Sequence, residues 1–180
     1  MQGDFFWIVI TTTTTQNSAC LASSINCPTP MFLRNRTDNC SKPAFSYLYY
    51  TCCYQAVSNQ LTIEFSLRED MSNWYFDDVS IRQGNSELLI NGGFESNFTG
   101  WTVSSSILNL SITPLAMTSP GSAHTGSVYL YSEAKYASDH IKQTVSVSQG
   151  QDVNISFWWL DDGGTPGASE LCEAVVTLTP

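Results

Sequence analysis

The chain has 180 residues and a formal net charge of −9, and only 13% of its residues are charged. The excess of acidic groups argues against binding to nucleic acid, which needs Lys and Arg to neutralise phosphates, and against anionic membrane surfaces. A metal cation or a neutral sugar suits this charge better.

Residues 1–44 are expected to be mostly irregular. They contain a Thr run, Thr11–Thr15, that is typical of a linker, and then a stretch rich in Cys and Pro without periodicity. Phe5–Ile10 is too short for a signal-peptide core, so no clear leader is recognised in the chain. No later stretch is long enough to span a bilayer, and we expect no membrane insertion.

Regular patterns begin at Phe45, and residues 45–180 are expected to form one module. Leu61, Ile63, Phe65 and Leu67 alternate with polar residues, as in a half-buried strand. Strands are expected in chain order at 46–55, 61–68, 74–81, 88–90, 107–113, 126–131, 141–147, 153–160 and 172–178. Because no segment has a helical period, the sequence predicts an all-β sandwich or barrel.

The six cysteines form an even set without metal-ligand spacing: Cys20, Cys27, Cys40, Cys52, Cys53 and Cys172. Disulfides therefore explain them better than zinc. Glycosylation sequons agree with an extracellular or cell-surface location; they lie at Asn35, Asn39, Asn97, Asn109 and Asn154.

The stretch from Trp74 to Trp101 carries a resemblance to a known family. WYFDDVSI, from Trp74, resembles the last strand of carbohydrate-binding modules of the 4/9 type, and LLINGGFE, from Leu88, resembles the first. These modules are galactose-binding-like jelly rolls. The resemblance implies that residues 45–82 are the last strands of one repeat and residues 87–180 the first strands of the next. We expect an antiparallel β-sandwich of jelly-roll type closed in circularly permuted order, with two unfinished halves as the alternative.

The same resemblance implies a structural calcium site. Its ligands would be Asp77, Glu95 and the backbone at Gly93, because calcium takes carboxylate and carbonyl oxygens. Asp77 is preferred to Asp78 because the first Asp is the regular one in the family. The alternative is that Glu95 and Asp78 are solvated and that Asp77 caps a turn.

The order of strands in the family also implies a disulfide. In module order the strand Cys172–Leu178 is followed by Tyr47–Tyr54. If these strands pair antiparallel, Cys172 lies opposite Cys53 or Cys52, with a one-residue slip left open.

Trp158 is the first candidate for a ligand contact. It shares a strand face with Asn154, whose sequon implies solvent, so its ring either meets a ligand or lies under a loop. Tyr129, Tyr131 and Tyr136 are candidates to join it, since sugar rings stack on flat aromatic surfaces. Partial burial under loops is the alternative.

Catalysis is not expected. Neighbouring carboxylates such as Asp77-Asp78 point to opposite faces of a strand, whereas a glycosidase pair must converge across a cleft. The sequence predicts a non-catalytic, extracellular recognition module whose partner is a carbohydrate or glycoprotein surface. The alternative is a structural or adhesive spacer repeat without affinity for sugars.

Overall fold

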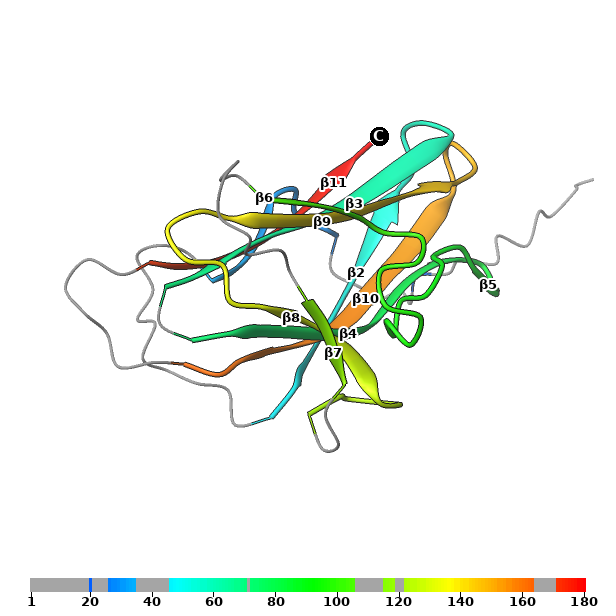
Figure 1. The fold of residues 1–180 in the computed structure, drawn as a ribbon. Coiled ribbons are helices and arrows are strands. Elements are labelled where there is room, and N and C mark those ends of the chain that lie inside the picture. Colours follow the sequence, from blue (N-terminus) through cyan, green and yellow to red (C-terminus); the bar gives the residue numbers. More distant parts are fainter. Residues whose placement is uncertain are drawn as a thin grey trace, which may run out of the picture.

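The computed structural model describes residues 20, 26–34, 46–70, 72–105, 115–118, 122–163 and 171–180. These residues form two antiparallel β-sheets and no helix, which confirms the predicted antiparallel β-sandwich (Figure 1). Accordingly, the described part of the chain contains no helix with the length and apolar character needed to cross a membrane.

Each sheet orders its strands differently from the sequence. The first sheet runs β2 (Leu48–Gln55), β10 (Asp152–Asp161), β4 (Trp74–Gln83), β8 (Val128–Ser132) and β7 (Leu115–Thr118), with β5 (Ser86–Glu87) paired to β4. The second runs β1 (Met31–Arg34), β11 (Cys172–Thr179), β3 (Gln60–Glu69), β9 (Asp139–Ser146) and β6 (Thr102–Ser105).

The expected join between two repeats lies between residues 82 and 87, and strands from before and after it alternate within each sheet. β10 lies between β2 and β4, and β11 lies between β1 and β3 (Figure 1). Residues from before and after the join therefore share both sheets. β1 comes from the segment 1–44 that we expected to be mostly irregular.

The core confirms the period-two pattern of the strands. Leu61, Ile63, Phe65 and Leu67 are all fully buried, because alternate residues of a strand point into a sandwich. The rings of Phe65 and Phe157 lie 5.5 Å apart, which joins the inner faces of the two sheets. Five large aromatic residues are also buried in the core: Trp74, Phe94, Trp101, Phe157 and Trp159.

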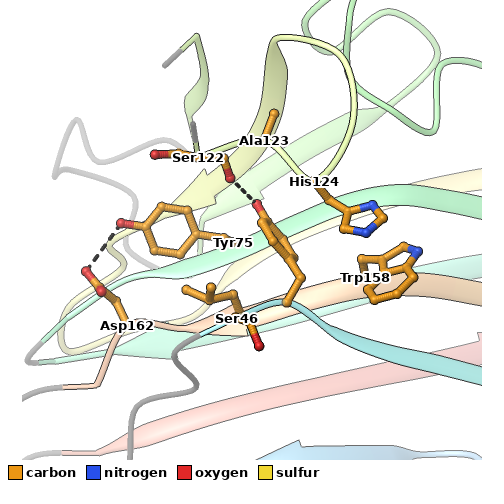
Figure 2. A pocket seen from close by; sticks show the side chains of 9 residues that line it. Ser46, Tyr75, Ser122, Ala123, His124, Trp158 and Asp162 are labelled. Atoms are coloured by element: carbon orange, nitrogen blue, oxygen red, sulfur yellow. Dashed lines mark hydrogen bonds between the residues drawn. The ribbon is translucent and has the colours of Figure 1, made fainter. Parts of the chain in front are cut away.

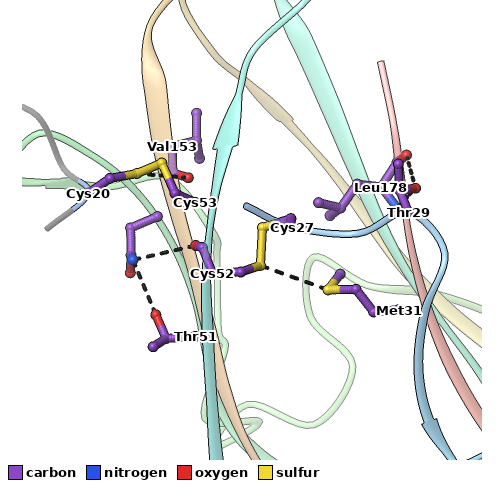
Figure 3. Close-up of a disulfide and its surroundings, with 10 residues drawn as sticks. Cys20, Cys27, Thr29, Met31, Thr51, Cys52, Cys53, Val153 and Leu178 are labelled. Carbon is purple, nitrogen blue, oxygen red and sulfur yellow. Dashed lines mark hydrogen bonds between the residues drawn. A yellow bond between two sulfur atoms is a disulfide. The ribbon is translucent and has the colours of Figure 1, made fainter. Parts of the chain in front are cut away.

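Two disulfides fasten the N-terminal segment to β2 (Figure 3). Cys27 bonds to Cys52, with Cα atoms 5.0 Å apart, and Cys20 bonds to Cys53, with Cα atoms 5.6 Å apart. Cys52 is fully buried, with its sulfur 3.8 Å from that of Met31. Cys53 is on the opposite side of the strand, so the adjacent cysteines need separate partners.

The predicted pairing of Cys172 with Cys53 or Cys52 is wrong. Cys172 is disulfide-bonded, but Cys52 and Cys53 already pair with Cys27 and Cys20. The expected pairing of their strands is wrong for the same reason: β11 pairs with β3 and β1 in one sheet, whereas β2 pairs with β10 in the other. Cys40 lies outside the described residues.

Candidate functional site

A β-bulge in β4 places Asp77 and Asp78. The register between β4 and β10 shifts between Ser156 and Trp158, and Asp78 has a φ of 49°. Because a bulge inserts one extra residue, the alternation of faces is interrupted there. Our expectation that the two carboxylates point to opposite faces therefore fails, and both bond to the same loop.

That loop comprises residues 122–127, and we call it the clamped loop. Asp77 Oδ2 accepts hydrogen bonds from the backbone N–H groups of His124 and Thr125, at 2.8 and 3.1 Å. Asp78 Oδ2 lies 2.6 Å from Nδ1 of His124, and Asp78 Oδ1 accepts from the Thr125 hydroxyl at 2.6 Å. The acidic pair thus fixes the loop over the outer face of the first sheet.

Glu95 holds the far end of the clamped loop. Its Oε1 accepts from the backbone N–H groups of Val128, at 2.9 Å, and Ser127, at 2.7 Å. These bonds lower the pKa of the Glu95 carboxyl below its usual value. The loop passes so close that a Cβ on Gly126 would lie 2.0 Å from Glu95 Oε1. A side chain at position 126 would therefore displace the Glu95 carboxylate, and the φ of 63° also favours glycine there.

The residues predicted to bind calcium meet in this region, but their hydrogen bonds do not fit a calcium site. Gly93 lies beside both aspartates, since a Cβ there would be 3.6 Å from Asp78 Oδ1 and 3.8 Å from Asp77 Oδ1. Both oxygens of Asp77 already accept backbone N–H groups, which a cation would have to displace.

Among the described residues, the acidic side chains around the clamped loop do not form a group of three converging metal ligands. Over the described ranges, the only close group of potential metal-ligand side chains contains Cys20 and Cys53, which are bonded to each other. Burial raises the pKa of Asp77 to about 6, although N–H donors from Thr125, Asp78 and His124 oppose that rise. Calcium stays a prediction from the resemblance alone.

A pocket of about 540 Å³ lies between the clamped loop and the sheet (Figure 2). β4 and β10 supply its floor, and the segment before β2 supplies another wall. Its lining residues are Ser46, Tyr47, Tyr75, Ser122, Ala123, His124, Trp158, Leu160 and Asp162. Four chain segments that are distant in sequence therefore build one concave site.

Trp158 lies partly under the clamped loop. Its ring stacks on that of His124, with centroids 3.8 Å apart and an interplanar angle of 17° (Figure 2). On β2 the ring of Tyr49, which is opposite Trp158 in register, lies 4.9 Å away. Trp158 is thus half-buried between two rings and still lines the pocket.

Two tyrosines shape the rest of the pocket. The Tyr47 hydroxyl donates to the carbonyl oxygen of Ser122 at 2.8 Å, which joins the segment before β2 to the clamped loop. The Tyr75 hydroxyl donates to Asp162 Oδ2 at 3.4 Å (Figure 2). Asp161, next to Asp162, is instead fully buried and accepts from Arg34 Nε at 3.1 Å.

The other predicted ligand residues do not line the pocket. Tyr129 is buried, with its ring 5.5 Å from that of Tyr75. Tyr131 donates its hydroxyl to Asn73 Oδ1 at 2.7 Å. Tyr136 is 75% exposed, and its backbone N–H donates to Asp70 at 2.9 Å. Four lining residues were not predicted from the sequence: Tyr47, Tyr75, His124 and Asp162. Of these, only Tyr75 has a usable signal, because it lies on the outward side of a predicted strand.

Two of the predicted glycosylation sites are described. Asn97 is exposed and has a φ of 54°, in the loop before β6. Asn154 is half-buried in β10, where its Nδ2 donates to Thr51 Oγ1 at 3.2 Å. Asn35, Asn39 and Asn109 lie outside the described residues. Glycosylation stays a prediction.

No protein-family model, curated protein or solved structure matches the chain. The function is therefore inferred from the geometry of the site and from the two motifs that carry the family resemblance.

Proposed function

We propose that the protein is a non-catalytic, extracellular recognition module that binds carbohydrate in the pocket on the first sheet. The observation that carries this proposal is the pocket itself, a cavity of about 540 Å³ that presents Tyr47, Tyr75 and Trp158. Such cavities are the usual form of small-ligand sites, with apolar walls and a few polar groups that set orientation.

The chemistry of the walls suits a sugar. A sugar ring has apolar C–H faces and a rim of hydroxyls, and the tyrosine and tryptophan rings can stack on those faces. Asp162 and the hydroxyl of Tyr75 are exposed polar groups that can bond the sugar hydroxyls. The two disulfides are compatible with an extracellular location.

One observation favours the alternative, a structural or adhesive spacer. One face of the Trp158 ring is covered by His124, and this contact can serve to pack the clamped loop without any ligand. In that case Trp158 contributes to stability and not to binding.

The experiment is a binding screen of the folded protein on a panel of plant, fungal and animal polysaccharides, followed by variants. Trp158→Ala and Tyr75→Ala should abolish retention on the polysaccharide that the wild type binds. Phe32→Ala, an exposed aromatic residue on β1 in the other sheet, is the matched control and should bind as the wild type does. If no polysaccharide is retained, while Trp158→Ala lowers the melting temperature strongly, the spacer function is the correct one.

A further inference from the structure

The described lining of the pocket contains a carboxylate but no Lys or Arg, and its imidazole, on His124, is bonded to Asp78. Among the described lining residues, Asp162 is the only carboxylate. Asp77 and Asp78 add negative charge behind the clamped loop, where each bonds to His124. The chain as a whole carries a formal charge of −9.

Burial and the neighbouring carboxylates raise the pKa of two tyrosines in the pocket. The pKa of the Tyr47 phenol is raised, first by burial and then by the charge of Asp77. The pKa of Tyr75 is raised to about 12, again by burial first and then by Asp162. Each phenol therefore stays protonated and neutral, with an intact ring face.

Aromatic faces and a carboxylate together are the chemistry that recognises an organic cation. The face of an aromatic ring is electron-rich and attracts an ammonium group, and this attraction is stronger where water is excluded. Tyr47 and Tyr75 are two such rings on one cavity, and Asp162 is bonded to the second of them. A neutral sugar uses the ring faces but leaves the carboxylate without a charged partner.

We propose that the pocket binds a positively charged ammonium group carried by its ligand, as on the sugar units of deacetylated chitin. This inference rests on the proposed carbohydrate-binding function and narrows it to amino sugars with a free or alkylated amine. Anionic sugars should be excluded, because their carboxylates or sulfates would face Asp162 across the cavity.

The test compares two oligosaccharides of the same length and backbone by calorimetric titration at neutral pH. One carries trimethylammonium groups, whose charge does not depend on pH, and the other carries neutral N-acetyl groups. Physiological salt is used so that the net charge of the protein does not dominate binding. The wild type should bind the charged oligosaccharide about tenfold more tightly, as expected of a partly desolvated cation–aromatic contact.

Asp162→Asn should reduce that preference, because it removes the carboxylate and leaves the aromatic faces, and the fold should stay intact because Asp162 is exposed. Asp152→Asn, at the opposite end of β10, is the matched control and should keep the preference. Equal affinity for the two oligosaccharides, or an equal loss in both variants, would overturn the ammonium site and leave the carbohydrate function standing.

Choline is titrated in parallel to separate the two proposals. If choline binds and Asp162→Asn weakens it, while neither oligosaccharide binds, the ammonium site is correct and the carbohydrate function is wrong. If neither choline nor any sugar binds, both proposals fail.

Discussion

The two disulfides that hold β2 are nested, and this arrangement allows a quantitative prediction of their contribution to the free energy of unfolding. Cys20–Cys53 spans 33 residues of sequence, and Cys27–Cys52 lies inside it with a span of 25. A disulfide stabilises mainly by restricting the unfolded chain, and the effect grows with the logarithm of the loop that it closes. When both bonds are present, each one closes a shorter loop than its span suggests.

The expected cost follows from the chain-entropy relation. Alone, a loop of 33 residues would be worth about 3.7 kcal/mol. With Cys27–Cys52 intact, the outer bond closes a ring of only about eight residues, so Cys20→Ala/Cys53→Ala should cost about 2.5 kcal/mol. Removing both bonds should cost about 6 kcal/mol, which is comparable to the total stability of many domains.

Urea unfolding of the wild type, the outer double variant and the quadruple variant measures these values. The slope of the transition should also rise, since an unfolded chain with fewer cross-links exposes more surface. A cost of about 3.7 kcal/mol for the outer pair alone would mean that Cys27–Cys52 does not form. A cost near zero for the quadruple variant would refute the role of both bonds as staples of β2.

Three further predictions concern the polar contacts. Burial alone would raise the pKa of Asp70, but two hydrogen bonds from Arg68 and others from backbone N–H groups hold it below its usual value. The contribution of Asp70 to stability is therefore present above pH about 4 and is lost as the pH falls through the folded-state pKa. In Asp70→Asn, the melting temperature should depend less on pH in the acid range than it does in the wild type. Gly126→Ala should displace Glu95, open the clamped loop and weaken ligand binding. Gly84→Ala is the control, because Gly84 also has a positive φ, of 60°, but no atom lies within 4 Å of an added Cβ. It should cost only about 1–2 kcal/mol of backbone strain and leave binding unchanged. The family resemblance predicts a higher melting temperature with calcium than with a chelator, whereas the structure leads us to expect equal values, because hydrogen-bond donors already occupy the carboxylates that hold the clamped loop. A higher melting temperature with calcium would show that the cation replaces those donors.

Local patterns were enough to predict the fold class. The alternation of Leu61, Ile63, Phe65 and Leu67 with polar residues is a property of one strand and needs no knowledge of its neighbours. The same holds for Trp158, whose outward position followed from its strand alone.

The site depended on long-range placement and was predicted only in part. The bulge at Asp78 breaks the period-two rule, and nothing in WYFDDVSI marks which residue adopts a positive φ. Tyr47 lies just before β2, although the sequence placed it inside a strand, and His124 lies in an irregular segment, where sequence gives no direction for a side chain. The disulfide prediction failed because it assumed which strands are neighbours, and β10, not β11, pairs with β2.

The interleaved strand order has a consequence for how the chain acquires its structure. β2 and β4 are near each other in sequence, yet each makes its main pairing with β10, which is synthesised much later, and β3 pairs with β11. Because such pairings must close long loops before they gain any contacts, folding should be slow and should begin only after β10 has left the ribosome. Until then the unpaired edges of β2, β3 and β4 are exposed to other chains, so the nascent protein should depend on chaperones that shield hydrophobic strands.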